Sequence, residues 1–124
     1  MIAVPRTVRV WAYGKPTDLR KGYNGLVGIV QKELGRDPLD GDLFLFVSGR
    51  RRGCKVLMWD GTGLCIFMKR LERGRFADVW RGAAPLRLTS SELALFVEGC
   101  TLVGRHALSP TEITSKSLAL DDRA

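Results

Sequence analysis

Two short apolar runs separated by an Asp-Gly turn sequence constrain the fold of this chain more than any other feature. The runs are Cys54–Trp59 and Leu64–Met68, and the residues between them are Asp60-Gly61-Thr62-Gly63. Glycine supplies the positive φ that a tight turn needs, so the pattern predicts a β-hairpin with antiparallel strands. The segments that flank the hairpin then meet at the end opposite the turn, which we call the hairpin base.

Positive charge flanks the predicted hairpin on both sides. The chain has a formal net charge of +7, and most of that excess falls between residues 50 and 81. Clustered cations attract polyanions such as nucleic acids, because contacts with phosphates release bound counterions. The alternative is a solvated surface that keeps the protein soluble. The eight cations at the hairpin base are Arg50, Arg51, Arg52, Lys55, Lys69, Arg70, Arg73 and Arg75.

Apolar residues recur with helical spacing between residues 18 and 34, which predicts a long N-terminal helix. Thr17 can cap its start, and Asp18 suits the positive end of its dipole. The outer face carries Gly25 and Gly28 beside lysines, so another backbone can approach it closely. A marginal helix held only by its apolar face is the alternative. The cations near this face form a second expected basic patch of Arg20, Lys21 and Lys32.

The predicted fold class is α+β, an antiparallel β-meander of three to five strands packed with one long N-terminal helix and one short C-terminal helix. The C-terminal helix starts at Thr89-Ser90-Ser91-Glu92, which has the form of a capping box, and ends near Glu98. We expect one domain over residues 1–108 and a flexible polar tail over residues 109–124. The strands expected outside the hairpin are Thr7–Tyr13, Leu43–Val47, Phe76–Trp80 and Leu86–Leu88.

The residues of the usual catalytic and cofactor sites are missing from the sequence. His106 is the single histidine, and with Cys100 it supplies at most two ligands for a metal ion. The sequence contains neither a P-loop nor a dinucleotide-binding motif, so we expect no cofactor and no bound metal. A small metal-dependent nuclease is kept as a residual hypothesis, because such enzymes hold metals with carboxylates. Its candidates are Asp42, Asp60, Asp78 and Glu98, although Asp60 has the simpler role of a turn residue.

The sequence carries no signal for export or for a membrane. Its three cysteines do not have the spacing of a disulfide framework. The N-terminus lacks the apolar segment of a signal peptide, and no apolar run approaches the roughly 20 residues of a membrane span. We therefore expect a reduced, cytoplasmic protein that does not contact a membrane.

Four stretches of the chain resemble a known family. They are Pro16–Gly22 (PTDLRKG), Leu43–Phe46 (LFLF), Trp59–Leu64 (WDGTGL) and Lys69–Phe76 (KRLERGRF). With these stretches, the sequence between about Val8 and Gly99 is similar to the small accessory protein TnpB of the bacterial insertion-sequence group numbered sixty-six. This family is distinct from the longer RNA-guided nuclease that shares the TnpB name.

The resemblance implies a role in moving a transposable element, beside a separate and larger transposase. It supplies no catalytic residues to carry over, so we expect a protein that is not an enzyme. The first hypothesis is a DNA-binding accessory protein whose basic residues contact the phosphate backbone at the element's ends. The second is an adaptor that docks on the transposase, or on another protein of the element, without binding DNA itself.

Overall fold

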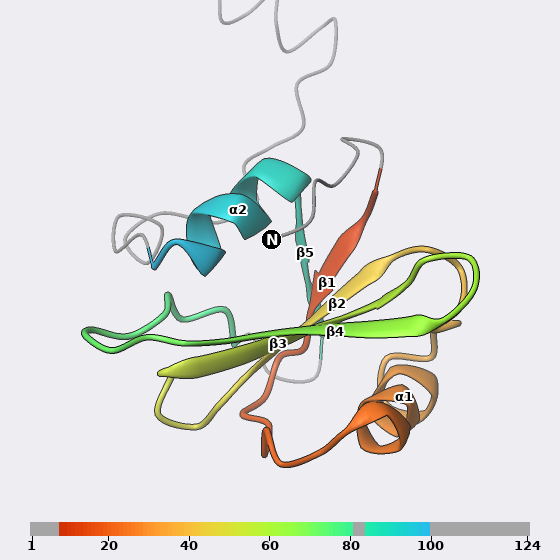
Figure 1. Cartoon of the computed structure of the whole chain (residues 1–124), viewed down its shortest axis with the longest axis horizontal. Coiled ribbons are helices and arrows are strands. Elements are labelled where there is room, and N and C mark those ends of the chain that lie inside the picture. The colour runs from red at the N-terminus through yellow and green to blue at the C-terminus, as the bar shows by residue number, and fades with distance from the viewer. Residues whose placement is uncertain (1–7, 81–83, 100–124) are drawn as a thin grey trace, which may run out of the picture.

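A five-stranded sheet with one helix on each face makes up the part of the chain that the computed structural model describes, residues 8–80 and 84–99 (Figure 1). The strand order across the sheet is β4-β3-β2-β1-β5. Neither helix is long and apolar enough to cross a membrane. The elements are β1 (Val10–Ala12), α1 (Tyr23–Lys32), β2 (Leu43–Val47), β3 (Gly53–Trp59), β4 (Leu64–Arg70), β5 (Leu86–Leu88) and α2 (Ser90–Val97).

The predicted hairpin is confirmed. β3 pairs antiparallel with β4 along the whole length of both strands. In the turn, the Asp60 carboxylate accepts hydrogen bonds from the backbone N–H groups of Thr62 and Gly63, both at 2.9 Å, and Gly61 has a φ of 102°. These backbone hydrogen bonds lower the pKa of Asp60 to about 2. Asp60 therefore has the turn role that the sequence indicates.

The expected purely antiparallel meander is wrong. β1 pairs in parallel with β2, with Val10 opposite Leu43, while β5 pairs antiparallel with the other side of β1. α1 connects β1 to β2, and such a crossover returns the chain to the edge where the first strand began, so the two strands run in the same direction. The sheet is therefore mixed, and only its β2-β3-β4 part is a meander.

The expected long N-terminal helix is also wrong, because α1 has 10 residues and begins five residues later than predicted. The residues assigned to its start have other partners. The Thr17 N–H donates to the Val47 carbonyl at 2.9 Å, which extends the chain along β2. The Asp18 carboxylate accepts hydrogen bonds from the backbone N–H and the guanidinium of Arg20. The local sequence pattern does not show that the Thr17 N–H bonds to β2, so it could not predict the later start of the helix.

The C-terminal helix starts as expected, since Thr89 and Glu92 form the reciprocal hydrogen bonds of a capping box. Residues 76–80 are not the strand that was expected. Their apolar side chains belong instead to a layer between the sheet and α2, where the Phe76 ring stacks on Phe96 with 4.8 Å between centroids. Cys100, His106 and the tail from residue 109 lie outside the described residues.

Each face of the sheet has its own core, as α1 and α2 lie on opposite sides (Figure 1). α1 buries Leu26 and Val30 against Phe44, Phe46 and Leu57 of the sheet. The β2 side chains therefore alternate between the two cores, which explains why the whole strand is buried. The α2 core includes Val10, Ala12, Leu43, Leu45, Val47, Val56, Leu88, Leu93 and Phe96.

Candidate functional site

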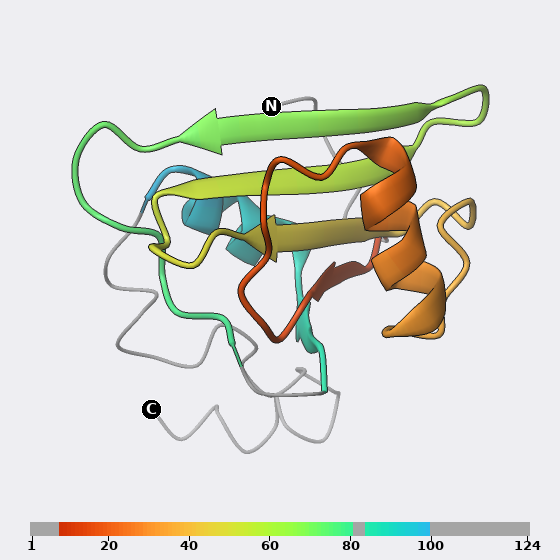
Figure 2. The ribbon, with the colours of Figure 1, turned by 90° about the horizontal axis from the view of Figure 1, so that it is seen from below.

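Two loops meet at the hairpin base. One connects β2 to β3 and spans residues 48–52, and the other follows β4 and spans residues 71–76 (Figures 1 and 2). The Leu71 N–H donates to the Arg52 carbonyl at 2.7 Å, and the Phe76 N–H donates to the Arg51 carbonyl at 2.6 Å. These backbone bonds hold the two ends of the second loop against the first loop.

Arg51 holds the two loops together through both its backbone and its side chain. It is the only residue other than glycine with a positive φ, 58°, in the part of the chain that the structure describes. Its N–H donates to the Ser48 carbonyl at 2.8 Å, and its guanidinium donates to the Phe76 carbonyl at 3.3 Å. Arg51 is half-buried and fastens the two loops together. Its side chain is thus engaged within the protein.

Both lysines of the hairpin also have partners within the fold. Lys55 donates its ammonium group to the Lys21 carbonyl at 2.8 Å and ties β3 to the segment before α1. Lys69 donates to the Val97 carbonyl at 2.8 Å. Val97 is the last residue of α2, where exposed carbonyls and the helix dipole favour a cation. Three of the eight predicted cations are therefore occupied by internal contacts.

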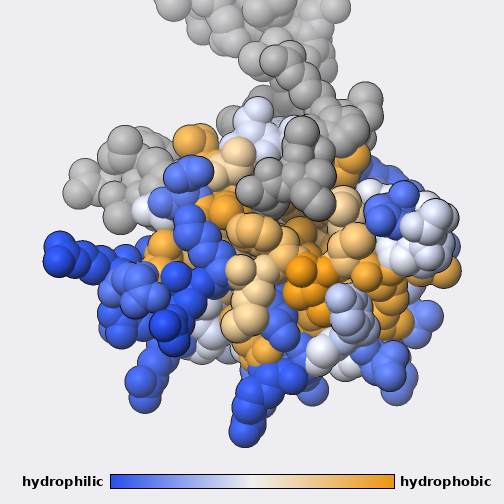
Figure 3. All heavy atoms as spheres, viewed as in Figure 1, coloured by the Kyte–Doolittle hydropathy of each residue, from blue (hydrophilic) through white to orange (hydrophobic). Residues whose placement is uncertain are grey.

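Four exposed arginines surround two adjoining cavities at the hairpin base. Arg50, Arg52 and Arg75 line the first, of about 420 Å³. Arg50, Arg52 and Arg70 line the second, of about 430 Å³. Arg73 is exposed on the same loop as Arg75. We call Arg50, Arg52, Arg70 and Arg75 the arginine cluster; Figure 3 shows hydrophilic side chains gathered at this end of the molecule.

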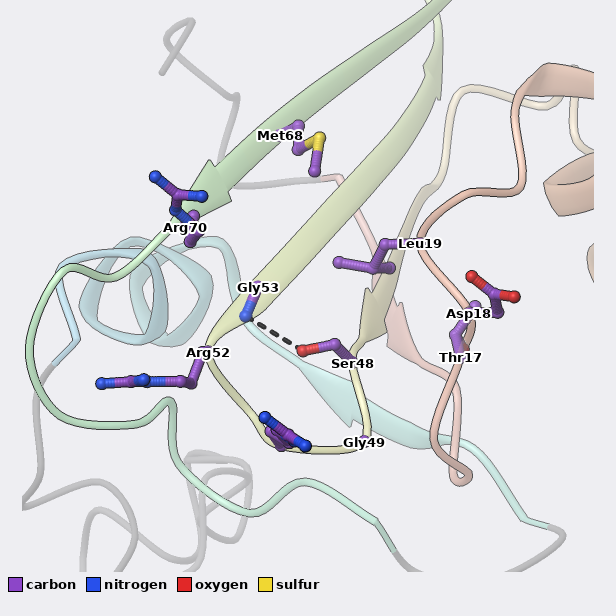
Figure 4. Close-up of a pocket in the computed structure, with 10 residues that line it drawn as sticks. Thr17, Asp18, Leu19, Ser48, Gly49, Arg52, Gly53, Met68 and Arg70 are labelled. Carbon is purple, nitrogen blue, oxygen red and sulfur yellow. Dashed lines mark hydrogen bonds between the residues drawn. The ribbon is translucent and has the colours of Figure 1, made fainter.

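The second cavity joins the hairpin base to the segment before α1. Thr17, Asp18 and Leu19 form one wall, and Figure 4 shows them across the cavity from Arg52 and Arg70. The approach is close because Gly53 lacks a side chain: a Cβ there would lie 2.9 Å from the Leu19 Cδ1 atom. The buried Thr17 hydroxyl has no hydrogen-bond partner within the described residues.

Acidic groups neutralise only part of this charge. Arg70 pairs with Glu72 at 3.2 Å, but both side chains are largely exposed, so the pair is weak and readily exchanged. Asp18 pairs with Arg20 at 2.7 Å, outside the cluster, and this hydrogen bond lowers the pKa of Asp18 to about 2. The cluster therefore carries a net positive charge.

The second expected patch does not join the arginine cluster. Arg20 is paired with Asp18, and the Lys21 side chain is exposed before α1. Lys32 is the last residue of α1, and Figure 2 shows α1 lying toward the turn end of the hairpin, away from its base. The three cations are thus split between the segment before α1 and the last residue of α1.

Of the nuclease candidates, Asp42 and Asp60 have structural roles, and the described carboxylates do not gather into a metal site. Asp42 is buried, accepts a hydrogen bond from the Trp11 indole at 3.0 Å and pairs with Arg9 at 3.1 Å. Arg36 lies over the Trp11 ring, 3.5 Å from its centroid, so this group acts as a polar clamp between β1 and β2. Among residues 8–80 and 84–99, no three His, Cys, Asp or Glu side chains gather to hold a metal ion.

Comparison with known families identifies the chain. Residues 8–107 match the model of the IS66 Orf2-like proteins, the TnpB family of IS66. The chain belongs to this family. IS66 Orf2-like proteins are accessory proteins of IS66 elements, so the chain is a transposition-associated accessory protein. The resemblance noted in the sequence is confirmed.

Relatives from one bacterium support the assignment. The chain is 39% identical over 101 residues to the uncharacterized protein y4hO of Sinorhizobium fredii, which covers 80% of this chain and 86% of that protein. It is 35% identical over 99 residues to the uncharacterized protein y4jC of the same organism, covering 80% and 85%. No solved structure matches this IS66 Orf2-like protein at a significant level.

Two of the stretches that carry the family resemblance face each other in the fold. Thr17, Asp18 and Leu19 belong to PTDLRKG, whereas Arg70 and Arg75 belong to KRLERGRF. Arg70 lines the same cavity as Thr17, Asp18 and Leu19, about fifty residues away in the sequence, and Arg75 lines the adjoining cavity. Sequence reasoning assigned the first stretch to a helix start and so missed that it forms a wall of the candidate site.

Proposed function

We propose that this IS66 Orf2-like protein binds DNA through the arginine cluster during transposition. The observation that carries the proposal is the convergence of Arg50, Arg52, Arg70 and Arg75 around two adjoining cavities. Guanidinium groups match the geometry of phosphate oxygens and can donate two hydrogen bonds to one group. Several of them on one surface suit a ligand with repeated phosphates better than a single small anion.

The contacts in this proposal position the protein on DNA without reading the sequence. Phosphate contacts fix register and orientation, whereas base edges must be read within a groove. The chemistry of strand transfer is left to a separate transposase, and the accessory protein contributes DNA contacts at the element's ends.

Fluorescence anisotropy with a labelled duplex from the element's end tests this function. If the cluster and Arg73 make about five phosphate contacts, a plot of log affinity against log salt concentration should have a slope of about −4.5. The variant Arg52→Ala/Arg75→Ala should bind more weakly and flatten the slope by about 2, because two contacts are lost.

Lys21→Ala/Lys32→Ala is the matched control, because it removes the same charge from exposed positions outside the cluster. It should leave the salt slope close to that of the wild type. Equal losses in the two double variants would show that net charge alone binds DNA. Binding that is insensitive to salt would also contradict the proposal.

The adaptor function is a second candidate, favoured by the glycines of α1. A Cβ added at Gly22 or Gly28 would meet nothing within 4 Å, so internal packing does not require glycine at either position. Tyr23, next to Gly22 at the start of α1, is 49% exposed. Such a surface suits the close approach of another protein, and the transposase is the proposed partner. Co-purification with the transposase after nuclease treatment, and its loss in Gly28→Gln, would support this function.

A further inference from the structure

β4 is an open edge of the sheet. Within the described residues it has a neighbour on one side only, β3 (Figure 2). Edge strands expose unpaired backbone groups, and proteins usually protect them with proline, a bulge, a short length or inward-pointing charge. β4 is seven residues long, contains no proline and begins with five apolar residues, Leu64 to Met68.

The hydrogen bonds at the two ends of the hairpin show which backbone groups face outward. Asp60 N–H donates to the Gly63 carbonyl at 3.1 Å, and Leu71 N–H donates to the Arg52 carbonyl at 2.7 Å. Every second residue pair of an antiparallel ladder is hydrogen-bonded. The odd-numbered residues of β4 therefore bond to β3. The residues whose N–H and C=O groups face the open edge are Leu64, Ile66, Met68 and Arg70.

We propose that two copies of this chain form a two-fold symmetric dimer by pairing β4 antiparallel with β4. The pairing that centres on Ile66 places Ile66 opposite its own copy, Leu64 opposite Met68, and Cys65 opposite Phe67. All five apolar residues then meet apolar residues, as stable cross-strand pairs require. Centring on Phe67 would instead place Leu64 opposite Arg70.

The self-complementary sequence of β4 favours a second copy over an unrelated strand. Its five apolar residues lie symmetrically about Ile66, so the same strand supplies an apolar partner for each of them. At the ends, this register places Arg70 of each copy opposite Thr62 of the other, and Glu72 opposite Asp60. Arg70 pairs with Glu72 within its own copy, so charge at the ends is balanced and the apolar pairs carry the contact. Such a dimer closes on itself, as isologous contacts do.

The surface along β4 supports an apolar contact. Met68 is 57% exposed, and the other four apolar residues of β4 are only partly buried. β4 lies toward the viewer in Figure 1, and Figure 3, seen from the same direction, shows apolar side chains across the middle of this face. Pairing the two edges would cover these side chains and satisfy the open backbone groups together.

Light scattering of the full chain without DNA tests the dimer. The wild type should have twice the 13.8 kDa of one chain. Leu64→Pro should halve that mass, because it removes an outward N–H and proline is tolerated at the first residue of a strand. Ile66→Lys should also halve it by placing like charges opposite each other. Leu95→Lys, the same kind of change at a 50% exposed position of α2, should remain dimeric.

Circular dichroism of each variant separates loss of the dimer from loss of the fold. A folded Leu64→Pro or Ile66→Lys variant that keeps the wild-type mass would overturn the proposal. A wild type that stays at the mass of one chain up to about 100 μM would overturn it as well, since even a weak specific interface is populated there. An open series of larger assemblies would exclude two-fold closure. None of these results depends on whether the protein binds DNA.

The register has its own test, through the native Cys65. In the pairing centred on Ile66, residues 65 and 67 of opposite copies form a non-hydrogen-bonded pair with Cα atoms about 4.5 Å apart, within the range of a disulfide. Phe67→Cys should therefore form an intermolecular disulfide under mild oxidation, and Phe67→Cys/Cys65→Ser should not. A disulfide in both variants would place Phe67 at the centre and refute the proposed register.

Discussion

Arg51 acts as a structural residue among arginines that face solvent. Its backbone and guanidinium join the β2–β3 loop to Phe76, and this contact brings Arg75 beside Arg50 and Arg52. Arg50 and Arg52 therefore face solvent, whereas the Arg51 side chain between them turns inward and bonds to the Phe76 carbonyl. The arginine cluster depends on Arg51 although Arg51 lies outside it.

Alanine usually destabilises a protein less than glycine does, but the positive φ of Arg51 should reverse this order at position 51. A residue with a Cβ pays roughly 1–2 kcal/mol in the left-handed region, so Arg51→Gly should be more stable than Arg51→Ala by about 1 kcal/mol. Arg50 has no positive φ, and there alanine should be the more stable, because glycine adds entropy to the unfolded chain. Urea denaturation of the four variants measures both differences. Alanine favoured at both positions would disprove the left-handed conformation of Arg51.

Predicting individual roles from the sequence fails where the partner is distant along the chain. Lys55 and Lys69 read as surface cations, yet each donates to a backbone carbonyl 34 and 28 residues away. A flexible ammonium reaches such carbonyls only after the fold is complete. Asp60, by contrast, accepts hydrogen bonds from residues two and three positions further along the chain, so its turn role can be predicted from the sequence.

Elements whose determinants are local were predicted well. The hairpin and the start of α2 rest on turn and capping residues within a few positions of each other, and both are confirmed. The start of α1 and the direction of β1 relative to β2 depend on tertiary pairing, and both predictions were wrong. Thr17 illustrates the cause, because its N–H bonds to Val47 of β2 rather than serving a helix.

The capping box of α2 gives a quantitative prediction at the scale of one element. Thr89→Ala should lower the free energy of unfolding by about 1 kcal/mol, because the N–H of Glu92 loses its acceptor at the helix start. Ser91→Ala is the matched control, since Ser91 is exposed in the first turn of α2 and does not cap it. Chemical denaturation monitored by tryptophan fluorescence compares them. An equal effect of both substitutions would argue against the capping box.

At the scale of the whole molecule, the arginine cluster and the open edge of β4 meet at Arg70. The arginine cluster occupies the end of the sheet at the hairpin base, while the open edge of β4 runs perpendicular to that end. In a β4–β4 dimer centred on Ile66, the two Arg70 Cα atoms lie eight residue steps apart, or about 27 Å along the strands. The two clusters then face opposite ends of a continuous ten-stranded sheet.

This geometry, which combines the proposed function and the proposed dimer, predicts that the protein brings two DNA duplexes together. Two duplexes labelled with donor and acceptor dyes should show energy transfer with the wild type, because each cluster of the dimer can hold one. Leu64→Pro should abolish the transfer while a single duplex still binds within about threefold, since its arginine cluster is intact and a shift of this size is below 1.4 kcal/mol. Arg52→Ala/Arg75→Ala should weaken both signals, because two of the phosphate contacts are lost, and should remain a dimer. Energy transfer that persists in a monomeric Leu64→Pro would mean that one chain holds both duplexes, and the two-ended arrangement would then be wrong.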